Sequence, residues 1–148
     1  MTATILVLNG PNLNLLGERE PEIYGHETLA DIEALCRAET DAGGVKLDFR
    51  QTNVEHEMVV WLQEARTGLA GIAINPAAFS YSGYSIYDAI KAVNCPVIEV
   101  HLSNIHRRDE AWRSKSIMSA AVTGTISGLG ASGYVLAVRH LVRLAGGA

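Results

Sequence analysis

The fold is decided by the stretch Ile5-Leu6-Val7-Leu8-Asn9-Gly10-Pro11-Asn12-Leu13-Asn14. Its first four residues form an unbroken apolar run, which is typical of a parallel strand that is buried on both faces. The glycine and proline that follow predict a turn at the end of this strand. Open α/β sheets bind ligands in the crevice at the carboxyl ends of their strands. We therefore expect the amides of Asn9, Asn12 and Asn14 to line a binding crevice.

The remaining chain alternates between helix-like and strand-like patterns. Thr28 with Asp31 three residues later resembles a capping box, and the helix that follows ends at Gly43. Further helices are predicted over 53–68, 83–94 and 133–144, and further strands over 45–50, 70–74, 97–100 and 121–126. This order predicts a parallel sheet with helices on both faces. We expect one domain over 1–148, a three-layer α/β sandwich with a five-stranded parallel sheet.

The composition narrows the class of protein. With 48% hydrophobic and 19% charged residues, the chain is ordinary for a soluble globular protein, and a net charge of −4 gives no basic surface for nucleic acid. The first residues lack the pattern of a signal peptide and no apolar run is long enough for a membrane, so we expect a cytoplasmic protein. Cys36 and Cys95 have neither metal-ligand nor redox spacing, and we interpret both as buried thiols.

A segment rich in turn residues follows the first strand, with Gly17, Pro21 and Gly25 around Arg19 and Tyr24. We interpret it as a flap over the crevice. To act as a base at about pH 7 to 8, a tyrosine must lower its pKa from about 10, which takes roughly 3–4 kcal/mol. An arginine about 4 Å away supplies about 4 kcal/mol at an effective dielectric near 20. The alternative is a surface loop with an incidental charge and ring.

A histidine ends the strand predicted over 97–100. At the end of a central strand His101 is well placed to act as an acid, because the unperturbed pKa of histidine is about 6.5. Glu99 points to the same side of the strand and is in position to orient the ring. Asn75 ends another predicted strand and should face the same crevice, although a role in forming the turn is the alternative.

Two further motifs lie in the second half of the chain. Arg107, Arg108 and Arg113 suit an acidic polyol, because a guanidinium binds oxygens in pairs, but a solvated basic face is the alternative. The run Gly128-Leu129-Gly130-Ala131-Ser132-Gly133 spells G-x-G-x-x-G. A dinucleotide site also needs a following strand with an acidic residue, which is not present before Ala148. We therefore interpret these glycines as positions of close helix-to-strand packing.

The longest motif, N-G-P-N-L-N-L-L-G-x-R-E-P-x-x-Y-G over residues 9–25, resembles the opening signature of the type II 3-dehydroquinate dehydratases. The segment Ile98-Glu99-Val100-His101-Leu102-Ser103-Asn104-Ile105-His106 extends the resemblance over nearly the whole chain. The family implies a flavodoxin-like domain, assembled as a dodecamer of trimers, that converts 3-dehydroquinate to 3-dehydroshikimate. It implies a small carboxylic acid as substrate, and no metal, cofactor or Schiff base.

The resemblance also implies four catalytic residues. Tyr24, kept basic by Arg19, removes a proton beside the substrate ketone, and an enolate results. Asn12 stabilises the enolate through a held water. His101 then protonates the departing hydroxyl.

The substrate-binding set that the family implies is Asn75, Asp88, Leu102, Ser103 and Arg113, with the backbone of the Leu102 segment gripping the carboxylate. Asp88 is expected to reach the site of a neighbouring subunit, and a solvated helix residue is the alternative. The loop before Arg113 is one residue longer than the family pattern. We align Arg113 with the second family arginine and Trp112 with the aromatic residue before it, and leave Arg108 as the alternative contact.

The chain departs from the family at Tyr81, where most members have a histidine. A tyrosine is larger and lacks the second ring nitrogen, so we expect Tyr81 to line the pocket and to weaken binding, and Tyr81→His to improve kcat/KM. One rival is a paralogous dehydratase that acts on a modified quinate-like acid or has reduced activity. The other is a flavodoxin-like module that binds a mononucleotide, which the fold permits.

Overall fold

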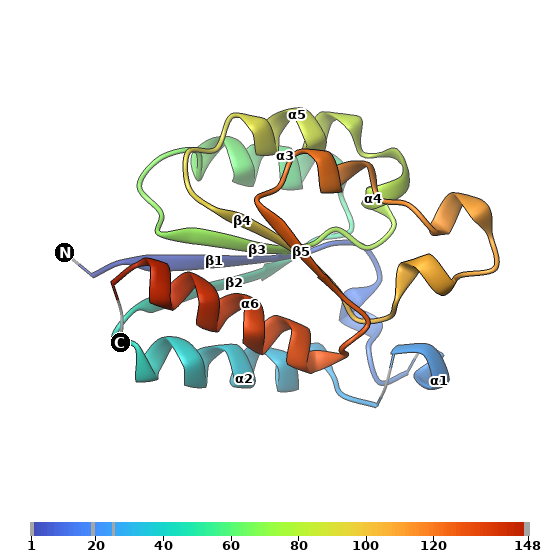
Figure 1. Cartoon of the computed structure of the whole chain (residues 1–148), viewed down its shortest axis with the longest axis horizontal. Helices are drawn as coiled ribbons and strands as arrows, with labels where there is room; N and C mark the ends of the chain where they lie inside the picture. Colours follow the sequence, from blue (N-terminus) through green and yellow to red (C-terminus); the bar gives the residue numbers. More distant parts are fainter. Residues whose placement is uncertain (1, 19, 25, 147–148) are drawn as a thin grey trace.

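The computed structural model describes residues 2–18, 20–24 and 26–146, and its strands form one parallel sheet in the order β2-β1-β3-β4-β5 (Figure 1). The strands are β1 (Thr4–Asn9), β2 (Lys46–Gln51), β3 (Gly71–Asn75), β4 (Val97–His101) and β5 (Gly124–Ser127). The helices are α1 (Pro21–Tyr24), α2 (Leu29–Ala42), α3 (Glu55–Glu64), α4 (Phe79–Ser82), α5 (Tyr84–Lys91) and α6 (Ala131–Leu144). This strand order is that of the flavodoxin-like fold, which confirms the predicted fold class.

The helices form two layers, one on each face of the sheet. Figure 1 shows α2 and α6 on one face and α3 and α5 on the other. Because β1 lies between both layers, its side chains alternate between two cores: Ile5 and Val7 pack with α2 and α6, whereas Leu6 and Leu8 pack with α3 and α5. This double burial explains the unbroken apolar run.

In the part of the chain that the structure describes, no helix could cross a membrane.

The ends of the elements show where local patterns are reliable. The predicted capping box is confirmed: the Asp31 amide donates to Oγ1 of Thr28 over 3.1 Å, and the Thr28 amide donates to Oδ2 of Asp31 over 3.0 Å. The prediction of a strand from residue 121 is wrong, because β5 begins at Gly124 after the 3-10 helix η4 (Ile117–Ala120). Ala121 and Val122 pack against the α5 layer instead of joining the sheet. The apolar character of these two residues predicts that they pack against the core, but it does not predict that they lie outside the strand.

The two cysteines differ in environment. Both thiols are free, but Cys36 is buried and Cys95 is only half-buried, so the expectation of two buried thiols is wrong for the second. Burial, together with the nearby carboxylates of Glu33 and Glu39, raises the pKa of Cys36 to about 12. Among the described residues no group of three or more His, Cys, Asp or Glu could hold a metal ion.

The strand order changes direction between β1 and β3, and their carboxyl ends meet there. Asn9 and Asn75 are register partners in these two strands, and the Gly10 amide donates to the Asn75 carbonyl over 2.8 Å. A Cβ at Gly10 would lie 2.3 Å from the carbonyl oxygen of Pro76. Glycine is required here because the two turns approach more closely than any side chain allows. The crevice predicted from the sequence therefore opens at this point.

We expect Gly10→Ala to destabilise the protein by about 1–3 kcal/mol, because the clash involves backbone atoms of a buried turn that must move. Gly124→Ala is the matched control, since a Cβ there would first meet Cδ1 of Ile98 at 3.9 Å, an ordinary contact. Urea unfolding followed by circular dichroism measures both changes. Equal stability of the two variants would contradict the close approach of the two turns.

Candidate active site

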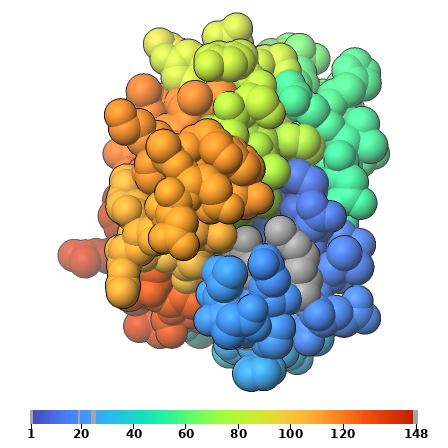
Figure 2. Space-filling view, turned by 90° about the vertical axis from the view of Figure 1, so that its right-hand side faces the viewer, coloured from blue at the N-terminus to red at the C-terminus, as the bar shows by residue number. Residues whose placement is uncertain are grey.

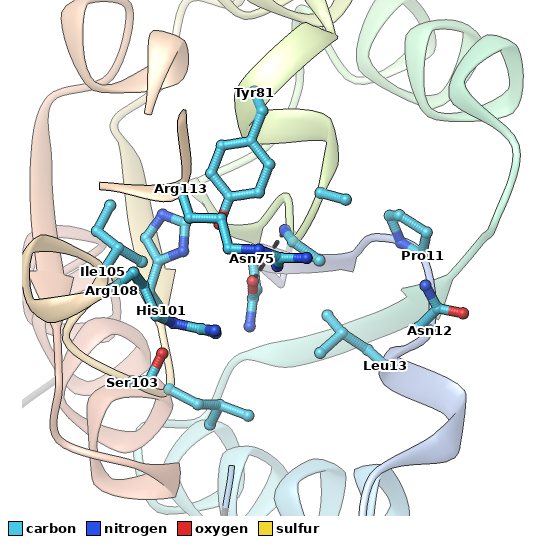
Figure 3. Close-up of a pocket in the computed structure, with 13 residues that line it drawn as sticks. Pro11, Asn12, Leu13, Asn75, Tyr81, His101, Ser103, Ile105, Arg108 and Arg113 are labelled. Carbon is cyan, nitrogen blue, oxygen red and sulfur yellow. Dashed lines mark hydrogen bonds between the residues drawn. The ribbon is translucent and has the colours of Figure 1, made fainter. Parts of the chain in front are cut away.

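A pocket opens at the carboxyl ends of β1, β3 and β4 (Figure 3). It is lined by Pro11, Asn12, Leu13, Asn75, Ala77, Ala78, Tyr81, His101, Leu102, Ser103, Ile105, Arg108 and Arg113. The structure therefore brings together most of the site residues expected from the sequence, including both alternatives for the substrate arginine. Figure 3 shows Asn12 on one side of the pocket and His101 on the other.

His101 and Glu99 form a hydrogen-bonded acid–base pair at the pocket. Both side chains point to the same side of β4, as strand alternation predicts, and Nε2 of His101 lies 2.5 Å from Oε2 of Glu99. The Ser119 hydroxyl donates to the other carboxylate oxygen over 2.7 Å. Burial alone would raise the pKa of Glu99, but hydrogen bonds from His101, Ser116 and Ser119 outweigh burial and hold that pKa below its ordinary value.

The ionised state of Glu99 determines which nitrogen of His101 carries a proton. A carboxylate only accepts, so Nε2–H of the ring donates to it, and Nδ1 is left to exchange a proton with a ligand. Since His101 lines the pocket and Glu99 is completely buried beneath it, the pair can supply a proton to a ligand while the carboxylate stays out of contact.

The floor of the pocket is a chain of hydrogen bonds that reaches from β3 to β1 through Tyr134. Nδ2 of Asn75 donates to the Tyr134 hydroxyl over 2.9 Å, and that hydroxyl donates to Oδ1 of Asn9 over 2.7 Å. Nδ2 of Asn9 in turn donates to the carbonyl of Arg50 over 2.9 Å. The expectation that Asn9 lines the crevice is therefore wrong, because its amide is buried and fully used below the pocket.

Asn75 faces the pocket with only part of its hydrogen-bonding capacity. Its Oδ1 accepts from the Ala77 amide over 3.1 Å, so the turn-forming role and the pocket-lining role are both real. One N–H and one lone pair of the amide remain for a ligand. The Ala77 backbone N–H can only donate, so it fixes which end of the Asn75 side chain accepts, and the other end donates to the Tyr134 hydroxyl. The sequence pattern predicts a helix that includes Tyr134, but not this hydrogen bond.

The segment after β1 places Asn12 at the pocket wall. Asn12 adopts a left-handed backbone conformation, and its backbone N–H donates to Oδ1 of Asn53 over 2.9 Å. Asn14 does not line this pocket, and its Oδ1 lies 3.4 Å from Nε2 of Gln51, so the expectation for Asn14 is wrong. The 3-10 helix η1 (Leu13–Leu15) turns that side chain away from the crevice.

The glycine-rich run supports the loop that follows β4. The Gly130 amide donates to the Leu102 carbonyl over 2.9 Å, and the Gly128 amide donates to the His101 carbonyl over 3.2 Å. Both glycines have positive φ, and a Cβ at Gly133 would lie 3.3 Å from Cγ2 of Ile126 and 3.4 Å from Cγ1 of Val100, which agrees with the packing interpretation. This support holds the backbone of Leu102 and Ser103 at the pocket.

Three expected site residues are not placed in this pocket. Asp88 is exposed on α5 and does not line it. Arg19 lies outside the described residues, and so does the side chain of Tyr24, whose backbone ends α1. Figure 2 shows the face of the molecule where the segments around 20–27 and 104–116 approach each other. The flap interpretation and the base role of Tyr24 stay predictions.

Fold and site together define a flavodoxin-like α/β protein with an acid–base pair and two arginines in a pocket suited to a small anionic ligand. The sequence model for the family described as Dehydroquinase class II matches residues 3–142. The chain belongs to this family, and the resemblance recognised in the sequence is confirmed.

Individual relatives match this chain along almost its full length. A protein of Methylobacterium radiotolerans named 3-dehydroquinate dehydratase is 55% identical over 148 residues, which cover 99% of this chain and 98% of the relative. The 3-dehydroquinate dehydratase 2 of Agrobacterium fabrum is 56% identical over 138 residues, 93% of each chain. The crystal structure of a type II dehydroquinase from Propionibacterium acnes matches with a TM-score of 0.89 and 46% identity, covering 97% of this chain and 98% of that one.

Proposed function

We propose that this protein is a hydro-lyase that converts 3-dehydroquinate to 3-dehydroshikimate by elimination through an enolate. The observation that carries the proposal is the buried pair of Glu99 and His101 in a pocket that also holds Arg108 and Arg113. The pair supplies an acid, and the arginines suit the carboxylate and hydroxyls of the substrate. Family membership and the names of the relatives support this choice over a mononucleotide-binding module.

The proposed reaction has two proton transfers. Tyr24, ionised beside Arg19, takes the proton next to the ketone, and the electron pair of that C–H bond forms the enolate. Asn12 holds a water that hydrogen-bonds to the enolate oxygen. When the enolate collapses, the hydroxyl in the β position leaves with the proton of His101, so that water and a conjugated enone are the products. No metal or cofactor is needed for these steps.

The substrate is proposed to be held from three sides. The backbone at Leu102 and Ser103, which the glycine turn supports, grips the carboxylate, and Arg113 reaches the ring hydroxyls. Asn75 donates through its remaining N–H. Tyr81 forms part of the wall opposite this backbone segment.

The direct test is ultraviolet absorbance of the conjugated enone during incubation of the purified protein with 3-dehydroquinate. Steady growth of this absorbance supports the proposal. If no turnover occurs with 3-dehydroquinate while a modified quinate-like acid is dehydrated, the paralogue is the correct reading. A purified protein that carries flavin absorbance and is inactive on both acids would establish the mononucleotide-binding module instead.

We further propose that the active protein is a homo-oligomer of trimers, assembled as a dodecamer, because Asp88 is expected to complete the site of a neighbouring subunit. Its exposed position on α5, outside the pocket of its own chain, supports this. Light scattering of the active fraction should therefore give at least the mass of three chains. Asp88→Asn should raise KM with this mass unchanged, and a fully active monomer would contradict the shared site.

A further inference from the structure

Three side chains from two separate segments stack at the rim of the pocket. The rings of Tyr81 and Trp112 meet edge to face, with centroids 5.1 Å apart and an angle of 88° between the planes. The guanidinium carbon of Arg113 lies 4.2 Å from the centroid of the Trp112 ring and 6.0 Å from that of Tyr81. We call these three residues the rim cluster. Tyr81 and Arg113 line the pocket, whereas Trp112 is 57% exposed.

Ring contacts are the main restraint on the guanidinium of Arg113. Its Nε is buried and has no hydrogen-bond partner among the described residues. The ion pair with Glu110 is long, 3.6 Å from Nε to Oε1, and the Glu110 side chain is half exposed. An ion pair so open to solvent contributes little, so the face of the Trp112 ring is the stronger restraint.

An arginine held by its face keeps the donors along its edge available. A guanidinium has five N–H donors in one plane, and stacking on a ring uses none of them. Nε–H is buried, but the N–H groups of the two terminal nitrogens belong to a side chain that lines the pocket with Arg108 and His101, where oxygens of an anionic ligand would bind. The position of Arg113 therefore depends on a ring that itself is outside the reacting centre.

We propose that Trp112 is a positioning residue that acts through Arg113, and that the rim cluster sets the affinity for substrate as one unit. The inference rests on the proposed function for the identity of the substrate, 3-dehydroquinate. Tyr81 takes part by packing its ring edge against Trp112, which a smaller imidazole does not reproduce. The cluster reverses the expectation for Tyr81→His: that change removes a support of Arg113 and should raise KM rather than lower it.

Three single variants test whether the aromatic face of Trp112, rather than its apolar volume, positions Arg113. Trp112→Leu keeps an apolar side chain but removes the aromatic face, so KM for 3-dehydroquinate should rise about 2- to 30-fold, with kcat nearly unchanged. Trp112→Phe retains the face and should restore most of the affinity. Trp61→Leu is the matched control, because Trp61 also stacks with an arginine, Arg50 at 5.3 Å, but neither of them lines this pocket. An unchanged KM in Trp112→Leu would overturn the proposal.

A double variant shows whether Trp112 acts through Arg113. If it does, adding Trp112→Leu to Arg113→Leu should leave KM where Arg113→Leu alone puts it, because the group being positioned is already gone. A merely structural role of Trp112 would raise KM by the same factor in both backgrounds. Equal factors would therefore refute positioning through Arg113.

Fluorescence tests the rim cluster without any turnover. The chain has two tryptophans, so in a Trp61→Phe background the tryptophan emission, excited selectively over that of the tyrosines, comes from Trp112 alone. Tyr81→Leu and Arg113→Leu, each in this background, should shift or change the intensity of that emission, because each removes a group packed against the ring. Unchanged emission in both would overturn the rim cluster. Changed emission in a protein that is inactive on 3-dehydroquinate would confirm the cluster and refute the proposed function.

Discussion

Tyr24→Phe should lower kcat for 3-dehydroquinate by about 10²- to 10⁴-fold, the usual contribution of a general base, while KM changes little. Phenylalanine keeps the ring and removes the proton acceptor. The enone assay at saturating substrate measures the loss, and urea unfolding shows whether the fold is intact. Near-normal turnover in a stable variant would remove Tyr24 from the mechanism.

Arg19 provides the companion measurement. If its charge lowers the pKa of Tyr24, Arg19→Lys should reduce kcat and move the ascending limb of the pH profile, where Tyr24 loses its proton, toward higher pH, since a lysine ammonium does not match the guanidinium fork. This pH profile distinguishes activation of Tyr24 from simple loss of a substrate contact, which would leave the limb in place.

The second large effect is expected at the acid. His101→Ala should lower kcat by about 10²- to 10⁴-fold, because the hydroxyl would then leave without a proton donor. Glu99→Gln should reduce kcat less, because the ring is retained and the glutamine oxygen can still accept from Nε2–H, but the negative charge of the carboxylate is lost. The same assay decides both cases. Full activity of His101→Ala would assign the acid to another group.

Glu99→Gln also has a predicted signature in stability. The pKa of Glu99 is lower in the folded chain than its ordinary value near 4.3, which holds in the unfolded chain. The carboxylate therefore contributes its full stabilisation above the unfolded pKa and loses it as the pH falls through the folded pKa. As the pH falls from neutral into that acidic range, the free energy of unfolding should decrease more for the parent than for Glu99→Gln. Urea midpoints at a series of pH values test this difference.

The sequence predicted those features that depend on local pattern. The apolar run of β1, the capping box at Thr28 and the pairing of Glu99 with His101 all follow from the period of a strand or helix. The position of the pocket follows from the rule that ligands bind at the carboxyl ends of parallel strands. These predictions needed no information about distant parts of the chain.

The features that were missed depend on contacts between distant segments. Asn9 and Asn75 both end buried strands. Their sequence positions do not show that the side chain of Asn9 is hydrogen-bonded to Tyr134 below the pocket, or that Asn75 lines the pocket and also contacts Tyr134. In the same way, Trp112 reads as a loop residue until the fold brings Tyr81 against it. A buried tyrosine hydroxyl needs a hydrogen-bond partner, and this rule could have pointed to the network beneath the pocket.

The hydrogen bond from Tyr134 to Asn9 joins residues 125 positions apart, from the last helix to the first strand. During synthesis β1 is made long before α6, so the Tyr134 hydroxyl cannot donate to Oδ1 of Asn9 until α6 has been made and has docked. The Asn75 side chain can be oriented earlier by the amide of Ala77, two residues away, but its Nδ2 also meets the Tyr134 hydroxyl only after α6 docks. We therefore expect a chain that ends before α6 to lack the hydrogen-bonded floor of the pocket.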